Sequence, residues 1–206
     1  MAFIFLCGSS SVGKTELLNK FPSSFSGKRV NKVGMSFQAI REQLGNPTWE
    51  DLENNKSIGI HQQTSGMDIY EDRILTNYKE LSNSDEVDED IFLYERCPLD
   101  IIGYSTAFSL PIEHIEYLSI KAEKLFQIIS TTHKVIVVHR PVDPTYPYDR
   151  RNNARPNSRI RMRCADSLID QLSYYKSLYN RNLTIIDSVN NDEAEAESIL
   201  RVLDGS

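Results

Sequence analysis

The stretch GSSSVGKT, from Gly8 to Thr15, decides the fold of this chain. It matches the pattern G-x-x-x-x-G-K-[ST], a loop whose backbone amides surround a phosphate group. The preceding run, AFIFLC from Ala2 to Cys7, is apolar and rich in branched and aromatic residues, which is typical of a buried parallel strand. The following residues, Glu16 to Lys20, favour a helix. Strand, glycine loop and helix therefore follow one another in the order that the motif requires.

Each residue type in this octet has a physical reason. Gly8 and Gly13 permit backbone angles and close approaches that a Cβ atom would block. The first amides of the helix attract anions, because the helix dipole is positive there. We expect Lys14 to reach the β- and γ-phosphates of a nucleotide, and the Thr15 hydroxyl to bind Mg²⁺. The candidate nucleotide-binding residues are Gly8, Ser9, Ser10, Ser11, Val12, Gly13, Lys14 and Thr15. A chance turn before a helix is the alternative, and the flanking elements argue against it.

Size and composition point to one ordinary globular domain. The chain has 206 residues, of which 40% are apolar and 25% charged. Its formal net charge of −6 argues against general binding of nucleic acids. No apolar run approaches the roughly 20 residues of a membrane span, and the first residues do not resemble a signal peptide. We therefore expect a cytoplasmic protein without membrane contact, in which Cys7, Cys97 and Cys164 are reduced thiols in or near the core. A homodimer is compatible with these features.

Strand-like and helical patterns alternate, which predicts an α/β fold: a three-layer αβα sandwich around a mainly parallel five-stranded sheet, formed by one domain over residues 1–206. The predicted strands are 2–7, 29–33, 91–95, 134–139 and 183–187. The predicted helices are 14–21, 37–44, 60–81, 99–108, 112–130, 163–180 and 192–203.

A second candidate cluster is YERCPLD, from Tyr94 to Asp100, at the end of the third predicted strand. Ligands of open α/β sheets bind beyond the carboxyl ends of the strands. Glu95 and Arg96 would therefore emerge beside the glycine loop if the two strands are neighbours. Phosphoryl transfer needs a carboxylate near the metal or the attacking oxygen, and cations around the transferred group. We expect Glu95 to bind Mg²⁺ or accept a proton and Arg96 to bind the acceptor; Asp100 is a weaker candidate. The alternative is an ion pair that only caps the next helix.

A third cluster is rich in arginine. It comprises Arg150, Arg151, Arg155, Arg159, Arg161 and Arg163. So many guanidinium groups in an acidic protein need anions nearby. We interpret residues 142–163 as a lid that closes over nucleotide phosphates, with Arg155 and Arg159 as the leading catalytic candidates. A solvated basic face that touches RNA or DNA is the alternative.

The acceptor is expected to bind within residues 34–81. A nucleobase needs an aromatic partner and an amide: Gln62 or Gln63 could supply the amide, and Phe37, Trp49 or Tyr70 the aromatic ring. Arg41 or Arg73 could bind a monophosphate. Each of these residues, taken alone, is more often structural than functional.

Taken together, GSSSVGKT, YERCPLD and the arginine-rich stretch resemble small P-loop kinases of nucleosides and nucleotides. The pattern is similar to thymidylate kinases, deoxynucleoside kinases, ribosylnicotinamide kinases and compact bacteriophage-type deoxynucleoside monophosphate kinases. The resemblance implies that Lys14 and Thr15 serve ATP and Mg²⁺, that Glu95 acts on the metal or the acceptor hydroxyl, and that Arg96 contacts the acceptor. Cys97 stands where these families have a serine, so a hydroxyl role there is not expected.

The resemblance leads to one main hypothesis about function. The chain would transfer the γ-phosphoryl group of ATP to a (deoxy)nucleoside monophosphate. A nucleoside or ribosylnicotinamide kinase with a hydroxyl acceptor is the first alternative. A nucleotide-dependent switch or NTPase that binds a protein partner, and a kinase of RNA or DNA ends, are the others. ATP is expected rather than GTP, because the chain has no Asn-Lys-x-Asp run.

Overall fold

The protein is described by a computed structural model that covers residues 2–9, 12–34, 38–82, 90–142, 158–178, 183–188 and 191–205. The strands are β1 (Ala2–Cys7), β2 (Ser24–Phe25), β3 (Lys28–Val33), β4 (Asp90–Tyr94), β5 (Lys134–His139) and β6 (Leu183–Asp187). The helices are α1 (Lys14–Lys20), α2 (Gln38–Gln43), α3 (Trp49–Asn54), α4 (Lys56–Ser82), α5 (Pro98–Ala107), α6 (Ile112–Thr132), α7 (Ser158–Leu178) and α8 (Asp192–Asp204).

The strands form one sheet in the order β2-β3-β4-β1-β5-β6. Five of them, β3 to β6 and β1, are parallel, as predicted. The sixth, β2, is a two-residue strand that pairs antiparallel with β3 across a turn at Ser26 and Gly27. It was not predicted, because two residues are too few to show a hydrophobic period. The sheet thus has six strands rather than the expected five.

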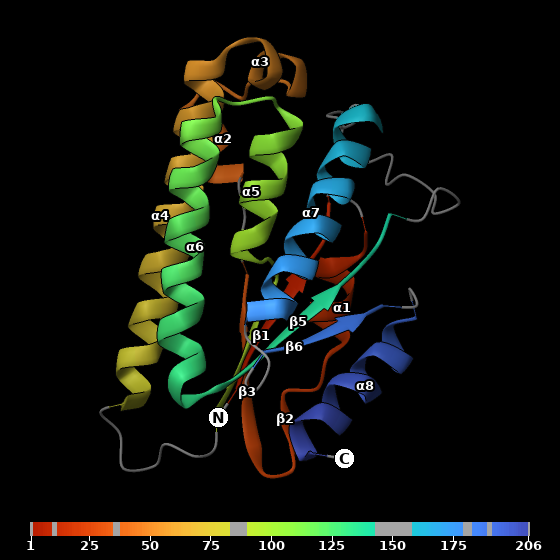
Figure 1. Cartoon of the computed structure of the whole chain (residues 1–206). Helices are drawn as coiled ribbons and strands as arrows, with labels where there is room; N and C mark the ends of the chain where they lie inside the picture. The colour runs from red at the N-terminus through yellow and green to blue at the C-terminus, as the bar shows by residue number, and fades with distance from the viewer. Residues whose placement is uncertain are drawn as a thin grey trace.

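The central strand β1 has all six residues buried, since helices cover both faces of the sheet. Side chains alternate between the faces along a strand. Phe3 and Phe5 therefore pack toward the helices α4 to α7, whereas Ile4 and Leu6 pack toward α1 and α8. Figure 1 shows the sheet between these two groups of helices, which confirms the three-layer arrangement.

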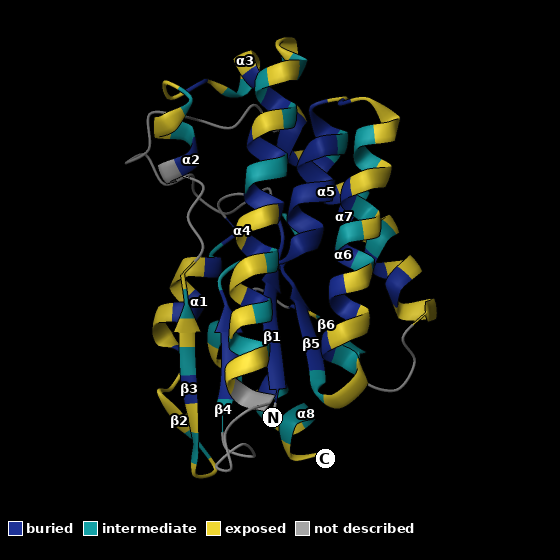
Figure 2. Cartoon of the chain, turned by 90° about the vertical axis from the view of Figure 1, so that its left-hand side faces the viewer, coloured by how far each residue is buried: buried dark blue, intermediate teal, exposed yellow. Residues whose placement is uncertain are grey.

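Helix α5 is the most enclosed helix of the larger layer. Figure 2 shows it buried along its length, between α4, α6 and α7. Gly103 makes this possible where α5 crosses α7, because a Cβ atom there would lie 3.1 Å from the Sγ of Cys164 and 3.1 Å from the Cγ of Leu168. The three cysteines are free and buried, as expected. None of the helices in the described part of the chain has the length and apolarity that a membrane span needs.

One helix was not predicted, and another begins earlier than predicted. The unpredicted helix is α3, before α4, and it begins with a reciprocal capping box between Thr48 and Asp51. Helix α7 begins at Ser158 rather than at Arg163. Residues 158–163 of the expected lid are therefore the first turns of α7, and residues 143–157 lie outside the described residues.

Candidate active site

The glycine loop joins β1 to α1 at the carboxyl edge of the sheet, as the motif predicts. Gly13 has φ 79° and Gly8 has φ 150°, both in the region that favours glycine. The ammonium group of Lys14 is buried and donates to the carbonyl oxygens of Gly8 and Ser9, the latter at 2.6 Å. Burial lowers the pKa of Lys14 to about 8, although the carboxylate of Asp100 opposes this effect. The lysine thus lies folded into the loop; Ser10 and Ser11 are outside the described residues.

Glu95 lies beside the glycine loop, because β4 is a direct neighbour of β1. The two strands are parallel, with Phe5 opposite Tyr94. The hydroxyl of Thr15 donates to Oε1 of Glu95, which joins the start of α1 to the end of β4. The backbone N–H of Glu95 donates to the carbonyl oxygen of Val33 at 3.0 Å, so the end of β3 lies alongside. The structure therefore brings together Lys14, Thr15 and Glu95, which the sequence had predicted as one site.

Asp100 is fully buried beneath the loop. Its Oδ1 accepts the N–H of Gly8 at 2.9 Å and the thiol of Cys7 at 3.3 Å. Its Oδ2 accepts the N–H of Cys97 at 3.4 Å, as part of a capping box at the start of α5. Asp100 thus anchors the loop rather than touching the nucleotide. The amide of Gly8 is occupied by this contact.

Arg96 and Arg73 lie near Glu95. Arg96 is within electrostatic range of Tyr70, Asp100 and Tyr104 as well as of Glu95. Arg73, on α4, donates to the carbonyl oxygen of Gly34 at 2.7 Å, just beyond β3. A Cβ atom on Gly34 would lie 3.9 Å from Oε2 of Glu95, so Arg73 is held close to that carboxylate. The cap of α5 comes from Asp100 and Cys97 rather than from Glu95 or Arg96.

The predicted base-binding residues have different surroundings. Gln62 and Gln63 are buried on α4, and the Oε1 atom of each has no hydrogen-bond partner among the described residues. Arg41 donates to the carbonyl oxygen of Pro47 at 2.8 Å, within the segment between α2 and α3. Phe37 lies outside the described residues.

The described arginines of the arginine-rich stretch all lie on α7, but they do not face the same way. Arg159 and Arg163 form ion pairs with Glu53 of α3, and Arg163 also donates to the carbonyl oxygen of Thr106 at 3.2 Å. Arg161 is buried. Arg150, Arg151 and Arg155 are outside the described residues. Arg159 is thus engaged by α3, away from the contacts that define the loop.

Arg140, which follows β5 directly, was not among the predicted site residues. Its guanidinium donates to the carbonyl oxygen of Gly13, the residue before Lys14. Its position directly after an apolar strand could have indicated a place at the carboxyl edge of the sheet, where the glycine loop lies.

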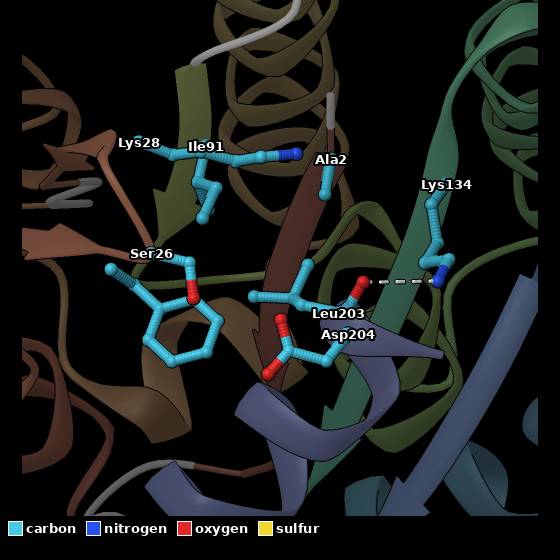
Figure 3. Close-up of a pocket in the computed structure, with 8 residues that line it drawn as sticks. Ala2, Ser26, Lys28, Ile91, Lys134, Leu203 and Asp204 are labelled. Atoms are coloured by element: carbon cyan, nitrogen blue, oxygen red, sulfur yellow. Dashed lines mark hydrogen bonds between the residues drawn. The ribbon is translucent and has the colours of Figure 1, made fainter. Parts of the chain in front are cut away.

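The pocket in Figure 3 lies at the opposite edge of the sheet. It has a volume of about 210 Å³ and is lined by the amino ends of β1 and β4, the β2–β3 turn and the end of α8. Lys134 donates there to the carbonyl oxygen of Val202 at 2.7 Å and caps α8. Because ligands of such sheets bind at the carboxyl edge, this pocket is separate from the candidate site.

Solved structures with the same arrangement identify the fold. Over 100% of both chains, the protein is similar to deoxyadenosine kinase from M. mycoides, with a TM-score of 0.56 and 12% identity. The chain has the fold of the P-loop nucleoside and nucleotide kinases. Thymidylate kinase from Candida albicans is similar over 98% of this chain and 91% of that chain, with a TM-score of 0.54 and 10% identity. The NadR protein matches 99% of this chain and 49% of its own, with a TM-score of 0.51 and 17% identity. No family model and no curated relative matches the sequence.

Within this kinase fold, the glycine loop is the P-loop, and the site described above lies at the carboxyl edge of the sheet, where ligands of open α/β sheets bind.

Proposed function

We propose that this chain transfers the γ-phosphoryl group of ATP to a (deoxy)nucleoside monophosphate. The observation that carries the proposal is the contact between Thr15 and Glu95, which joins the residue that follows Lys14 at the start of α1 to the carboxylate at the end of β4. The kinase fold supports it, since the similar proteins include a deoxyadenosine kinase and a thymidylate kinase. The proposal extends to a cytoplasmic enzyme of nucleotide metabolism, of the compact type that occurs in bacteriophages.

The Thr15–Glu95 pair fits Mg²⁺. Both groups offer hard oxygen atoms, which are the ligands that Mg²⁺ prefers. In the described part of the chain, no group of three or more His, Cys, Asp or Glu residues could hold a metal by itself. Few protein ligands are usual for Mg²⁺ in kinases, because phosphate oxygens and waters complete its coordination. When bound, the ion would neutralise charge on the β- and γ-phosphates.

The reaction would depend on positioning and charge, as in other phosphoryl transfers. Lys14 would leave the carbonyl oxygens of Gly8 and Ser9 and donate to the phosphates of ATP. Arg96 would hold the acceptor in line with the γ-phosphate. Arg155 and Arg159 remain our candidates for stabilising the transferred group.

The acceptor would lie along α4. Gln63, Met67, Tyr70 and Ile74 follow the spacing of one helix face, and Tyr70 lies near Arg96. Gln63 is about 10 Å farther along this face than Tyr70. A nucleotide with its phosphate near Arg96 and Arg73 could therefore place its base near Gln63. The unpaired Oε1 atoms of Gln62 and Gln63 support a ligand here, since buried polar atoms without partners are rare. Phe37 and Arg41 remain further candidates.

A nucleoside or ribosylnicotinamide acceptor is the second candidate, and the similarity to deoxyadenosine kinase favours it. In that reaction Glu95 would accept the proton of the acceptor hydroxyl. No arginine would then be needed at the far end of the acceptor pocket.

A panel of nucleosides and nucleoside monophosphates, incubated with ATP and Mg²⁺, tests the proposal through ADP release. We expect monophosphates to raise ADP production and nucleosides not to. Arg73→Met and Arg96→Met should raise the KM of the monophosphate about tenfold or more, as for a lost charge-assisted hydrogen bond, and Arg41→Met shows whether a third arginine takes part. Arg29→Met is the control, because Arg29 pairs with Asp90 at the opposite edge. If no acceptor raises ADP production, the kinase proposal is wrong.

A further inference from the structure

Arg140 is a buried cation that the proposed reaction does not use directly. It follows β5 and is only 4% exposed. Its backbone N–H donates to the carbonyl oxygen of Cys7 at 2.8 Å, so its main chain continues the pairing of β5 with β1. Its side chain then turns to the P-loop, where it donates to the carbonyl oxygen of Gly13. It therefore supports the peptide that precedes Lys14.

Two carboxylates from α8 hold this guanidinium in place. It donates to Oδ1 of Asp192 at 2.7 Å and forms an ion pair with Oε2 of Glu195 at 3.1 Å. Glu195 is itself buried and accepts the hydroxyl of Ser188. Lys20, at the end of α1, pairs with Asp192 at 2.7 Å. Arg140 and Lys20 are thus balanced by Asp192 and Glu195.

This charge balance decides what Arg140 can do. An unpaired guanidinium near the triphosphate would attract it, whereas a guanidinium between two carboxylates contributes little net charge. Arginine has a planar fork of donors, which can bind a carbonyl oxygen and two carboxylates at once. The contribution of Arg140 is therefore geometric.

The glycines of the P-loop fit closely against Arg140. A Cβ atom on Gly13 would lie 2.7 Å from the guanidinium, and one on Gly8 would lie 2.6 Å from the carbonyl oxygen of Arg140. Both distances are too short for a real contact. These glycines are thus required by the residue beneath the loop as well as by a phosphate above it.

We propose that Arg140 is a positioning residue that fixes the Gly13 peptide and ties the P-loop to the start of α8. Binding of a triphosphate then depends on α8 being docked. The inference rests on the proposed function, because it assumes that the P-loop binds a nucleoside triphosphate. A loop that is held before binding needs no reorganisation when the phosphates arrive.

Calorimetric binding of ATP and of inorganic tripolyphosphate, in the presence of Mg²⁺, tests the inference. Arg140→Lys keeps the charge but loses the fork, and Asp192→Asn weakens the contact from the α8 side. We expect each variant to bind both ligands more weakly by the same factor, about tenfold, as for a lost charge-assisted hydrogen bond. In steady-state assays the KM for ATP should rise while the KM for the acceptor stays unchanged.

Glu197→Gln is the matched control, because Glu197 lies on α8 and its ion pair, with Arg201, is an exposed contact outside the Arg140 network. It should bind both ligands as the unmodified protein does. Circular dichroism establishes which variants are folded. If Arg140→Lys does not fold, Asp192→Asn carries the test, because its carboxylate is at the rim of the network.

Three results would contradict the inference. Unchanged binding in folded Arg140→Lys and Asp192→Asn would show that the loop holds its shape without this network. If the variants bound ATP more weakly but tripolyphosphate normally, Arg140 would act on the adenine end of the ligand rather than on the phosphate site. If the unmodified protein binds neither ATP nor tripolyphosphate, the proposed function fails as well, and the inference with it.

Discussion

At the scale of single residues, Lys14 shows how the P-loop is built. Its ammonium is buried and donates to two carbonyl oxygens of its own loop. The lysine is thus hydrogen-bonded within its own loop. Burial disfavours the charged form more than the carboxylate of Asp100 favours it, and the pKa is lowered to about 8.

This pKa predicts how ATP binding depends on pH. Below pH 8 Lys14 is mostly protonated and can donate to the phosphates. Above that pH the free protein loses the proton, and binding must restore it. We therefore expect the affinity for ATP to fall as the pH rises through about 8, measured by calorimetry between pH 7 and pH 9.

Lys14→Met provides the control for this prediction. Its binding should be weak and nearly independent of pH over the same range. An equally steep fall in the Lys14→Met variant would assign the titration to another group.

At the scale of elements, the contact between α3 and α7 bears on the lid hypothesis. Arg159 is exposed, yet it pairs with Glu53, which lies on α3, a helix that was not predicted from the sequence. Breaking an exposed ion pair costs little free energy. Arg159 could therefore leave Glu53 and pair with a nucleotide at a small cost in free energy.

Glu53→Gln tests this competition. The change weakens the hold on Arg159, so we expect ATP to bind up to about fivefold more tightly, the range that an exposed pair allows. Glu50→Gln, on the same helix and exposed, should have no effect. Tighter binding in neither variant, or in both, would rule out Glu53 as a competitor for Arg159.

The crossing of α5 and α7 makes a prediction about stability. Gly103→Ala would place a methyl group within 3.1 Å of Cys164 and Leu168. Overpacking of this kind costs about 1–3 kcal/mol, which outweighs the roughly 0.5–1 kcal/mol that alanine gains over glycine in a helix. We expect a lower free energy of unfolding in urea. The exposed residue Ser173 on α7 is the control, since Ser173→Ala should change stability by less than about 0.5 kcal/mol. A stabilised Gly103→Ala variant would mean that the two helices can separate.

At the scale of the whole molecule, the two edges of the sheet have different roles. The carboxyl edge carries the P-loop, Glu95 and Arg140, and the amino edge carries the pocket of Figure 3. The larger helical layer contains α4, along which we propose that the acceptor binds. Its helix α3 contains the single tryptophan of the chain, whose ring packs on Tyr104 and Phe108 at centroid distances of 5.2 and 5.6 Å.

Trp49 should therefore report the two substrates differently. Its indole N–H is buried and has no hydrogen-bond partner in the part of the chain that the structure describes. We expect an acceptor nucleotide to shift the fluorescence emission more than ATP alone does, because the acceptor would bind against α4, next to α3, whereas the P-loop lies at the start of α1. Trp49→Phe should abolish the signal. If ATP alone produced the same shift as the acceptor, the assignment of α3 and α4 to the acceptor side would be wrong.

Much of the candidate site could be predicted because its parts are local. The P-loop and the end of β4 are short runs whose order along the chain implies their place at the carboxyl edge. Asp100 was judged a weak candidate, because its importance comes from Gly8, 92 positions earlier in the chain. The role of Arg140 was missed for the same reason, since its partners belong to the P-loop and to α8.

The amino-acid sequence by itself determined the P-loop motif and the parallel strands, because turn chemistry and hydrophobic period are encoded in neighbouring residues. Only the tertiary structure decided that β4 lies next to β1, that Asp100 and Arg140 support the loop from below, and that Glu53 engages Arg159. These contacts join residues far apart in the chain. Their geometry is set when the helices and strands pack, and no local pattern carries that information.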